Sequence, residues 1–212
     1  MARKKRDPNE PDICPFRVVT DTREQAPWSF DGIHGDARDR NRPLIIPVVT
    51  RTLATGDYSI EGMELLVSVE RKSIEDLYGT LGRERERFDR EIVRLDAMRF
   101  AAVVIEADWR EIINSPPPHT KLPPKSVYRS IIAYSQRFPR VHWFAMDGRR
   151  LAEITTFRIL ERFWKDRQEE RKSSGQMHAQ QRGNASNADQ SPDRSAGAKH
   201  SQRIIRGGIY SK

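Results

Sequence analysis

One segment with a strand-like pattern that ends in charged residues constrains the fold most strongly. Apolar and polar residues alternate over residues 65–72 as far as the charged positions Glu70 and Lys72, which predicts a β-strand. A glycine separates this strand from residues 57–60, so we expect a hairpin that brings Asp57 back toward Glu70. Glu70 and Lys72 then share one face, roughly 6–7 Å apart at about 3.3 Å per residue.

The chemistry of these residues indicates a metal site. Two carboxylates that converge, Asp57 and Glu70, make a hard-oxygen site suited to Mg²⁺ or Mn²⁺, and Lys72 beside them can position a water or neutralise charge in a transition state. Asp21 ends another predicted strand and Glu24 follows it, at the strand end where ligands gather in open α/β sheets. Converging carboxylates repel one another, and a bound cation relieves that repulsion. Taken singly, each residue is also compatible with an ordinary turn or a surface ion pair.

Length and charge limit the class of protein. The chain of 212 residues is long enough for one α/β domain with a core and tails, and its net charge of +8 favours a polyanionic partner. Residues 171–212 hold eight Lys or Arg and two Asp, a net of +6, so a nucleic-acid site in residues 1–170 must be a local patch. Cys14 is the only cysteine, which excludes an internal disulfide and a Cys-based zinc site.

The same residues bear on location. No apolar run is long enough to span a membrane, and the basic amino end is followed by no hydrophobic segment of a signal peptide. We therefore expect an intracellular protein, located in the cytoplasm or nucleoid if it is bacterial or viral.

Predicted strands and helices alternate along the chain, as in an α/β domain. The predicted strands span residues 16–21, 44–53 with a bend at Pro47, 57–60, 65–72, 100–107 and 141–146. The predicted helices span residues 74–81, 83–98, 109–114, 125–138 and 151–169. Ser73 is expected to cap the first helix, with Asp76 three residues later in the pattern of a capping box.

The two ends of the chain are predicted to lie outside the folded domain. We expect a flexible basic tail at residues 1–14, a domain at residues 15–170 and a disordered basic tail at residues 171–212, because residues 173–203 lack Val, Ile, Leu, Phe, Tyr and Trp. Non-specific attraction to phosphates and a passive linker are equal interpretations of this tail. The apolar patch at residues 204–210 is a candidate docking peptide.

The charged motif resembles the signature of the XPF/Mus-type structure-specific endonucleases. That signature is a Gly-Asp pair, a spacer, Glu-Arg-Lys, three residues and Asp, and it stands here as Gly56-Asp57, Glu70-Arg71-Lys72 and Asp76. Residues 19–24 resemble the first-strand element of that family, and residues 82–88 resemble its arginine-bearing helix. The resemblance covers roughly residues 16–165.

The resemblance implies an α/β, restriction-endonuclease-like fold, with a central mixed β-sheet flanked by helices. It further implies hydrolysis of DNA phosphodiester bonds at branched or flap DNA, with Mg²⁺ as cofactor and Mn²⁺ able to substitute. Asp57, Glu70 and Asp21 are expected to bind the metal, and Lys72 to assist the attacking water. The implied catalytic set is Asp21, Glu24, Asp57, Glu70, Arg71 and Lys72. The implied DNA contacts are Arg23, Arg83 and Arg87.

Several alternatives stay open. No tandem helix-hairpin-helix module follows the nuclease-like region, which leaves open both the preference for branched DNA and a homodimer or heterodimer through the nuclease domain. A non-catalytic DNA-binding or scaffolding subunit and a four-way-junction resolvase are the alternative functions. Arg71 is equally compatible with a salt bridge and a phosphate contact, and Arg83 and Arg87 with phosphate binding and ordinary solvated charges. Asp76 is interpreted as a helix cap, and Phe157 and Trp164 as core or dimer contacts.

Overall fold

The computed structural model describes residues 10–35 and 42–188, and the side chains as far as residue 174. A six-stranded sheet with the order β4-β2-β5-β6-β7-β8 forms the centre. Its strands are β2 (Val18–Asp21), β4 (Val48–Arg51), β5 (Tyr58–Ile60), β6 (Val67–Lys72), β7 (Phe100–Ile105) and β8 (Val141–Ala145). Strand β5 runs antiparallel to both of its neighbours, and the other neighbouring strands are parallel to each other. The sheet is therefore mixed, as predicted.

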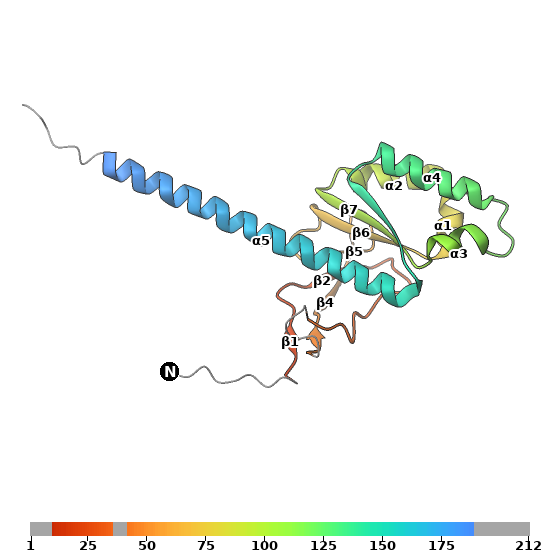
Figure 1. Cartoon of the computed structure of the whole chain (residues 1–212), viewed down its shortest axis with the longest axis horizontal. Coiled ribbons are helices and arrows are strands. Elements are labelled where there is room, and N and C mark those ends of the chain that lie inside the picture. Colours follow the sequence, from red (N-terminus) through yellow and green to blue (C-terminus); the bar gives the residue numbers. More distant parts are fainter. Residues whose placement is uncertain (1–9, 36–41, 189–212) are drawn as a thin grey trace, which may run out of the picture. The chain divides into compact units, whose positions relative to one another are not determined.

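Helices cover both faces of this sheet (Figure 1). They are α1 (Ile74–Leu81), α2 (Arg85–Asp96), α3 (Trp109–Asn114), α4 (Pro124–Arg137) and α5 (Gly148–Ala188). Residues of β7 alternate between the two faces, since Ala101 and Val103 pack with α1, α2 and α4, whereas Ala102 and Val104 pack with the first turns of α5. This arrangement confirms the predicted fold class, a mixed sheet flanked by helices.

The predicted hairpin of β5 and β6 is present. Tyr58 pairs with Val69 across antiparallel strands, and Asp57 N donates to Val69 O at 2.9 Å. Gly56, which precedes β5, has φ +73°, and a Cβ atom there would lie 2.0 Å from Ser68 Oγ. Only glycine fits this close approach, and the motif glycine thereby sets the position at which Asp57 meets the end of β6.

Local signals in the sequence account for several element boundaries. Ser73 caps α1, because its side chain accepts a hydrogen bond from Asp76 N at 3.1 Å, and α1 ends before Gly82. Phe88, Ile92 and Leu95 form the buried stripe of α2. Phe157 is fully buried, and the partly buried Trp164 stacks on Phe16, so both aromatic residues are core contacts.

The amino-terminal prediction needs a correction. Asp12–Ile13 form strand β1, which pairs in parallel with β3 (Leu44–Ile45), and Cys14 is buried. Backbone bonds from Asp12 N to Pro43 O and from Cys14 N to Ile45 O hold this segment in place. Residues 12–14 therefore belong to the folded part of the chain, and residues 1–9 of the predicted tail lie outside the described residues. Two residues are too few to show a strand pattern, so local sequence gave no signal for β1.

The carboxyl-terminal prediction is also corrected. The chain divides into two compact units, residues 1–168 and 169–212, and α5 continues to Ala188 instead of ending near residue 169. The residues of this extension are mostly Arg, Lys, Glu, Gln, Ala and Ser, many of which are good helix formers, so the lack of apolar residues does not prevent a helix. The rest of the predicted disordered tail, with the patch at 204–210, lies outside the described residues. No helix in the described chain is long and apolar enough to cross a membrane.

Candidate functional site

A pocket of about 730 Å³ lies where the carboxyl ends of β2 and β6 meet the start of β5 and one side of α2. Every site residue that the sequence predicts lines this single pocket. These residues are Asp21, Arg23, Glu24, Asp57, Glu70, Arg71, Lys72, Arg83 and Arg87. The topology brings them together because β2, β5 and β6 are consecutive strands of the sheet.

Asp57, Glu70 and Lys72 form the interior of the pocket. Asp57 Oδ2 accepts a hydrogen bond from the backbone N of Arg71 at 2.8 Å, and Glu70 Oε1 accepts one from Lys72 Nζ. Glu70 is only 4 % exposed. The buried Glu70 and the partly buried Asp57 thus lie near one ammonium group, which leaves the interior short of positive charge.

The pKa values of Asp57, Glu70 and Lys72 reflect this shortage of positive charge. Burial raises the pKa of Asp57 to about 6 against the opposing effects of the Arg71 N–H and Lys72, and Glu24 and Glu91 add to the increase. Burial also raises the pKa of Glu70 well above its usual range, although Lys72 opposes the change. For Lys72, burial favours the neutral amine, but the adjacent Glu70 carboxylate outweighs it and raises the pKa. The site therefore favours an additional cation.

The carboxylate of Asp21 is hydrogen-bonded within the protein. Its Oδ1 accepts hydrogen bonds from Arg23 N at 2.8 Å and Arg23 Nε at 2.7 Å, and its Oδ2 accepts from Arg23 Nη2 at 3.0 Å and Leu53 N at 2.6 Å. Burial opposes ionisation, but these bonds outweigh it and lower the pKa of Asp21. Four donors occupy the acceptor positions of one carboxylate. This geometry disfavours Asp21 as a metal ligand and favours a role in holding Arg23.

Arg71 alternates with Glu70 and Lys72 along β6, and its side chain forms salt bridges. Its Nε and Nη2 donate to Glu106 Oε1 and Oε2, each at 2.8 Å, and its Nη1 donates to Glu24 Oε1 at 3.2 Å. Of the two interpretations that the sequence left open for Arg71, the structure contains the salt bridge. Glu24 also accepts a hydrogen bond from Ala26 N at 2.7 Å. Glu24 therefore faces the Arg71 guanidinium at the edge of the pocket.

Sequence reasoning missed three charged residues at or beside the pocket. Glu91 lies on the inner side of α2, and its position among alternating charges gave no distinctive signal. Glu106 directly follows β7, which is parallel to β6, so the rule that ligands gather at carboxyl ends of strands could have identified it. Arg149 donates to Glu106 Oε1 at 2.8 Å from the start of α5, and nothing local in the sequence points to that contact.

The donor set is suited to Mg²⁺. Within residues 10–35 and 42–174, no three His, Cys, Asp or Glu side chains lie close enough together to hold a metal ion by themselves. Mg²⁺ does not require such a cage, because it usually keeps several waters and binds one or two carboxylates together with substrate phosphates. Asp57 and Glu70 supply hard oxygens whose burial is relieved by a cation. They fit the ion that the motif predicts.

The chain is similar to a known protein family and to solved structures. The family model described as the ERCC4 domain matches residues 20–154. No curated protein matches the sequence. Two solved structures are similar, one described as XPF from Aeropyrum pernix, with 19% identity and a TM-score of 0.44, and one described as the same protein in complex with DNA, with 18% identity and a TM-score of 0.48. The similarity covers 68% and 71% of this chain, and 58% and 66% of those two chains.

Proposed function

The chain belongs to the ERCC4-domain family, and on that premise we propose that it is a divalent-metal-dependent DNA endonuclease. The family match confirms the resemblance of the charged motif. The observation that carries the proposal is the pair of carboxylates formed by the partly buried Asp57 and the buried Glu70, which lie near Lys72 in a pocket lined with arginines. Such a pair is costly to bury unless it binds a cation or handles protons.

The residues have distinct tasks in this mechanism. Mg²⁺, when bound by Asp57 and Glu70, would supply Lewis acidity and a more acidic water. The Arg71 N–H fixes Asp57 Oδ2, which keeps that carboxylate directed along the end of β6. Lys72 Nζ holds Glu70 and places a positive charge where negative charge develops on the phosphate during attack. Asp21 contributes indirectly, through its hold on Arg23.

The DNA-contacting surface extends along α2. Arg87, Arg90 and Arg94 are exposed and lie at spacings of three and four residues, which places them in one stripe of the helix. Arg83 precedes them and, with Arg87 and Arg94, lines the pocket. The stripe from Arg87 to Arg94 is about 10 Å long at 1.5 Å per residue. This length suits contacts to successive phosphates of one strand that enters the pocket.

The preferred DNA structure rests on the family resemblance alone, and we propose branched or flap DNA as the substrate. A cleavage panel tests both the reaction and this preference. It comprises single-stranded, duplex, 3′-flap, splayed-arm and four-way DNA, each with Mg²⁺ or Mn²⁺. Preferential cleavage of four-way DNA would instead identify a junction resolvase.

The decisive variants are Asp57→Asn and Glu70→Gln, which keep the shape of each side chain and remove its charge. We expect each to lower cleavage at least a hundredfold while DNA affinity in the absence of metal is kept or slightly increased, since each change removes a negative charge that repels phosphate. Asp31→Asn makes the same chemical change at an exposed position and serves as the matched control. Wild-type cleavage by either variant would refute the assignment. DNA binding by the unmodified protein with no cleavage and no Mn²⁺ binding would instead identify a non-catalytic scaffold.

A further inference from the structure

Glu106 gathers four hydrogen bonds just outside the pocket. Besides the two bonds from Arg71, its Oε1 accepts from Trp28 Nε1 at 3.0 Å and from Arg149 Nη1 at 2.8 Å. Its side chain is only 10 % exposed. Donors from three separate parts of the chain, namely β6, the segment after β2 and the start of α5, therefore meet at one carboxylate. Charge-assisted bonds of this kind are shorter and stronger than neutral ones.

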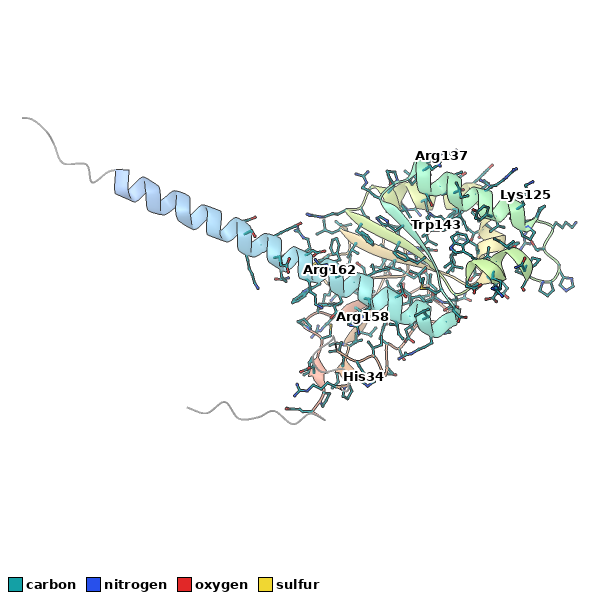
Figure 2. The ribbon with its side chains drawn as sticks, in the orientation of Figure 1. His34, Lys125, Arg137, Trp143, Arg158 and Arg162 are labelled. Atoms are coloured by element: carbon teal, nitrogen blue, oxygen red, sulfur yellow. The ribbon has the colours of Figure 1, made fainter. Side chains whose placement is uncertain are left out.

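Arg149 connects the same carboxylate to the loop that carries Glu24. Its Nη2 donates to Ala26 O at 2.7 Å and to Pro27 O at 3.1 Å, while its Nη1 bonds to Glu106. Farther along α5, Arg158 Nη2 donates to His34 O at 2.6 Å, and Figure 2 labels both of these residues. The first turns of α5 thus hold the segment after β2 at more than one point.

Arg71 connects these contacts to Asp57, a proposed metal ligand. The side chain of Arg71 is held by Glu106 and Glu24, and its guanidinium lies 5.9 Å from the centre of the Trp28 ring. The backbone N–H of the same residue holds Asp57 Oδ2 at 2.8 Å. Arg71 thus connects Glu106 and Glu24, through its side chain, with Asp57 and the end of β6, through its backbone N–H.

We propose that Glu106 and Arg149 are positioning residues for the metal site. They fix Arg71 and the Glu24 loop, and through these they fix the separation of Asp57 and Glu70. The inference rests on the proposed function, because it assigns these two residues a task only if Asp57 and Glu70 bind a divalent ion. Neither residue belongs to the Gly-Asp and Glu-Arg-Lys motif, and neither touches the reacting atoms.

The test uses Glu106→Gln in the full chain. The amide keeps one acceptor oxygen but turns an NH₂ group toward guanidinium donors, so Arg71 loses its paired contact. Changes to the groups that orient metal ligands typically cost 10- to 100-fold in affinity, and we expect about tenfold weaker Mn²⁺ binding by titration calorimetry. Cleavage should show a lower kcat with an unchanged KM for DNA. Mn²⁺ affinity equal to that of the unmodified protein would overturn the proposal.

Variants of Arg149 keep the test decisive if Glu106→Gln folds poorly. Arg149 is about half-exposed, so Arg149→Met should fold, and we expect it to weaken Mn²⁺ binding several-fold while Arg149→Lys retains most of the affinity. The double variant should weaken Mn²⁺ binding by less than the combined effects of the two single changes, because both remove the contact between Arg149 and Glu106. Arg162→Met, on the same helix and paired with Asp166, is the matched control and should bind normally. Normal binding by Arg149→Met would count against the proposal.

Asp57→Asn separates the two possible failures. If Asp57→Asn loses Mn²⁺ binding while Glu106→Gln and Arg149→Met keep it, the positioning inference fails and the proposed function stands. If Asp57→Asn binds Mn²⁺ like the unmodified protein, the proposed function itself fails.

Discussion

Replacing Asp57 by Asn should stabilise the metal-free protein at neutral pH. Burial, reinforced by Glu24 and Glu91, raises the pKa of Asp57 from its ordinary 3.8 to about 6 in the folded state. The folded protein therefore binds this proton more tightly than the unfolded chain does. The contribution of Asp57 to stability is highest below its unfolded pKa and falls as the pH rises from 3.8 to about 6. Above that range the partly buried charge of Asp57 destabilises the protein by its full amount.

The magnitude follows from the size of the pKa change. An increase of about two pKa units corresponds to about 3 kcal/mol of unfolding free energy at pH 7.5, since one unit is about 1.4 kcal/mol. Asn keeps an acceptor oxygen for the Arg71 N–H and carries no charge, so the variant should recover most of this free energy. A change of 1 kcal/mol moves the melting temperature of a domain of this size by roughly 2–4 °C. We therefore expect an increase of about 6–12 °C.

Circular dichroism melts in EDTA at pH 4.0, 5.0, 6.0 and 7.5 measure this effect. The variant should melt well above the unmodified protein at pH 7.5, and the difference should shrink toward pH 4.0. Added Mg²⁺ should raise the melting temperature of the unmodified protein but not that of the variant, because only a ligand that binds the folded state stabilises it. The exposed control Asp31→Asn should show neither effect. A variant that melts at or below the unmodified protein at pH 7.5 would refute the reasoning.

Two further predictions test the DNA surface and the motif glycine. Changing Arg87, Arg90 or Arg94 to Ala should weaken DNA binding uniformly across sequences, and each change should reduce the slope of log affinity against log salt concentration by about one. Arg137→Ala on α4 should leave that slope unchanged. Fluorescence anisotropy at several salt concentrations measures both the affinity and the slope. Gly56→Ala should lower the free energy of unfolding in denaturant by several kcal/mol, because its Cβ would lie 2.0 Å from Ser68 Oγ. Gly62 also has a positive φ, but no atom lies within 4 Å of a Cβ built there, so Gly62→Ala should lower it by only about 1–2 kcal/mol. Equal costs for the two glycines would contradict the steric argument.

Local patterns in the sequence were enough to predict the hairpin that carries the site. Alternation along β6, a glycine on each side of β5 and a serine cap after Lys72 are signals within a few residues of each other, and each corresponds to a feature of the structure. Such signals succeed because the period of a strand and the geometry of a cap depend on neighbouring residues only. The family assignment succeeded for a related reason, since its motif lies entirely within this locally defined segment.

The contacts around Glu106 could not be predicted in this way. Arg71 and Arg149 lie 35 and 43 residues from it in sequence, on opposite sides along the chain. Their meeting depends on the parallel register of β6 and β7, which sets Lys72 beside Ile105, and on the packing of α5 against the other face of the sheet. The length of α5 escaped prediction for a different reason. Its extension contains many good helix formers but no apolar stripe, and periodicity detects only the stripe.

Asp21 shows that the number of carboxylates in a pocket can exceed the number that are available to bind a metal ion. The family resemblance implied that Asp21 binds the metal together with Asp57 and Glu70. In the structure, four donors occupy Asp21 and lower its pKa, whereas burial without enough donors raises the pKa of Asp57 and Glu70. A divalent ion gains most from the carboxylates that the protein has left least satisfied. The number of donors already bound, more than the number of acids present, therefore indicates which side chains are available as ligands.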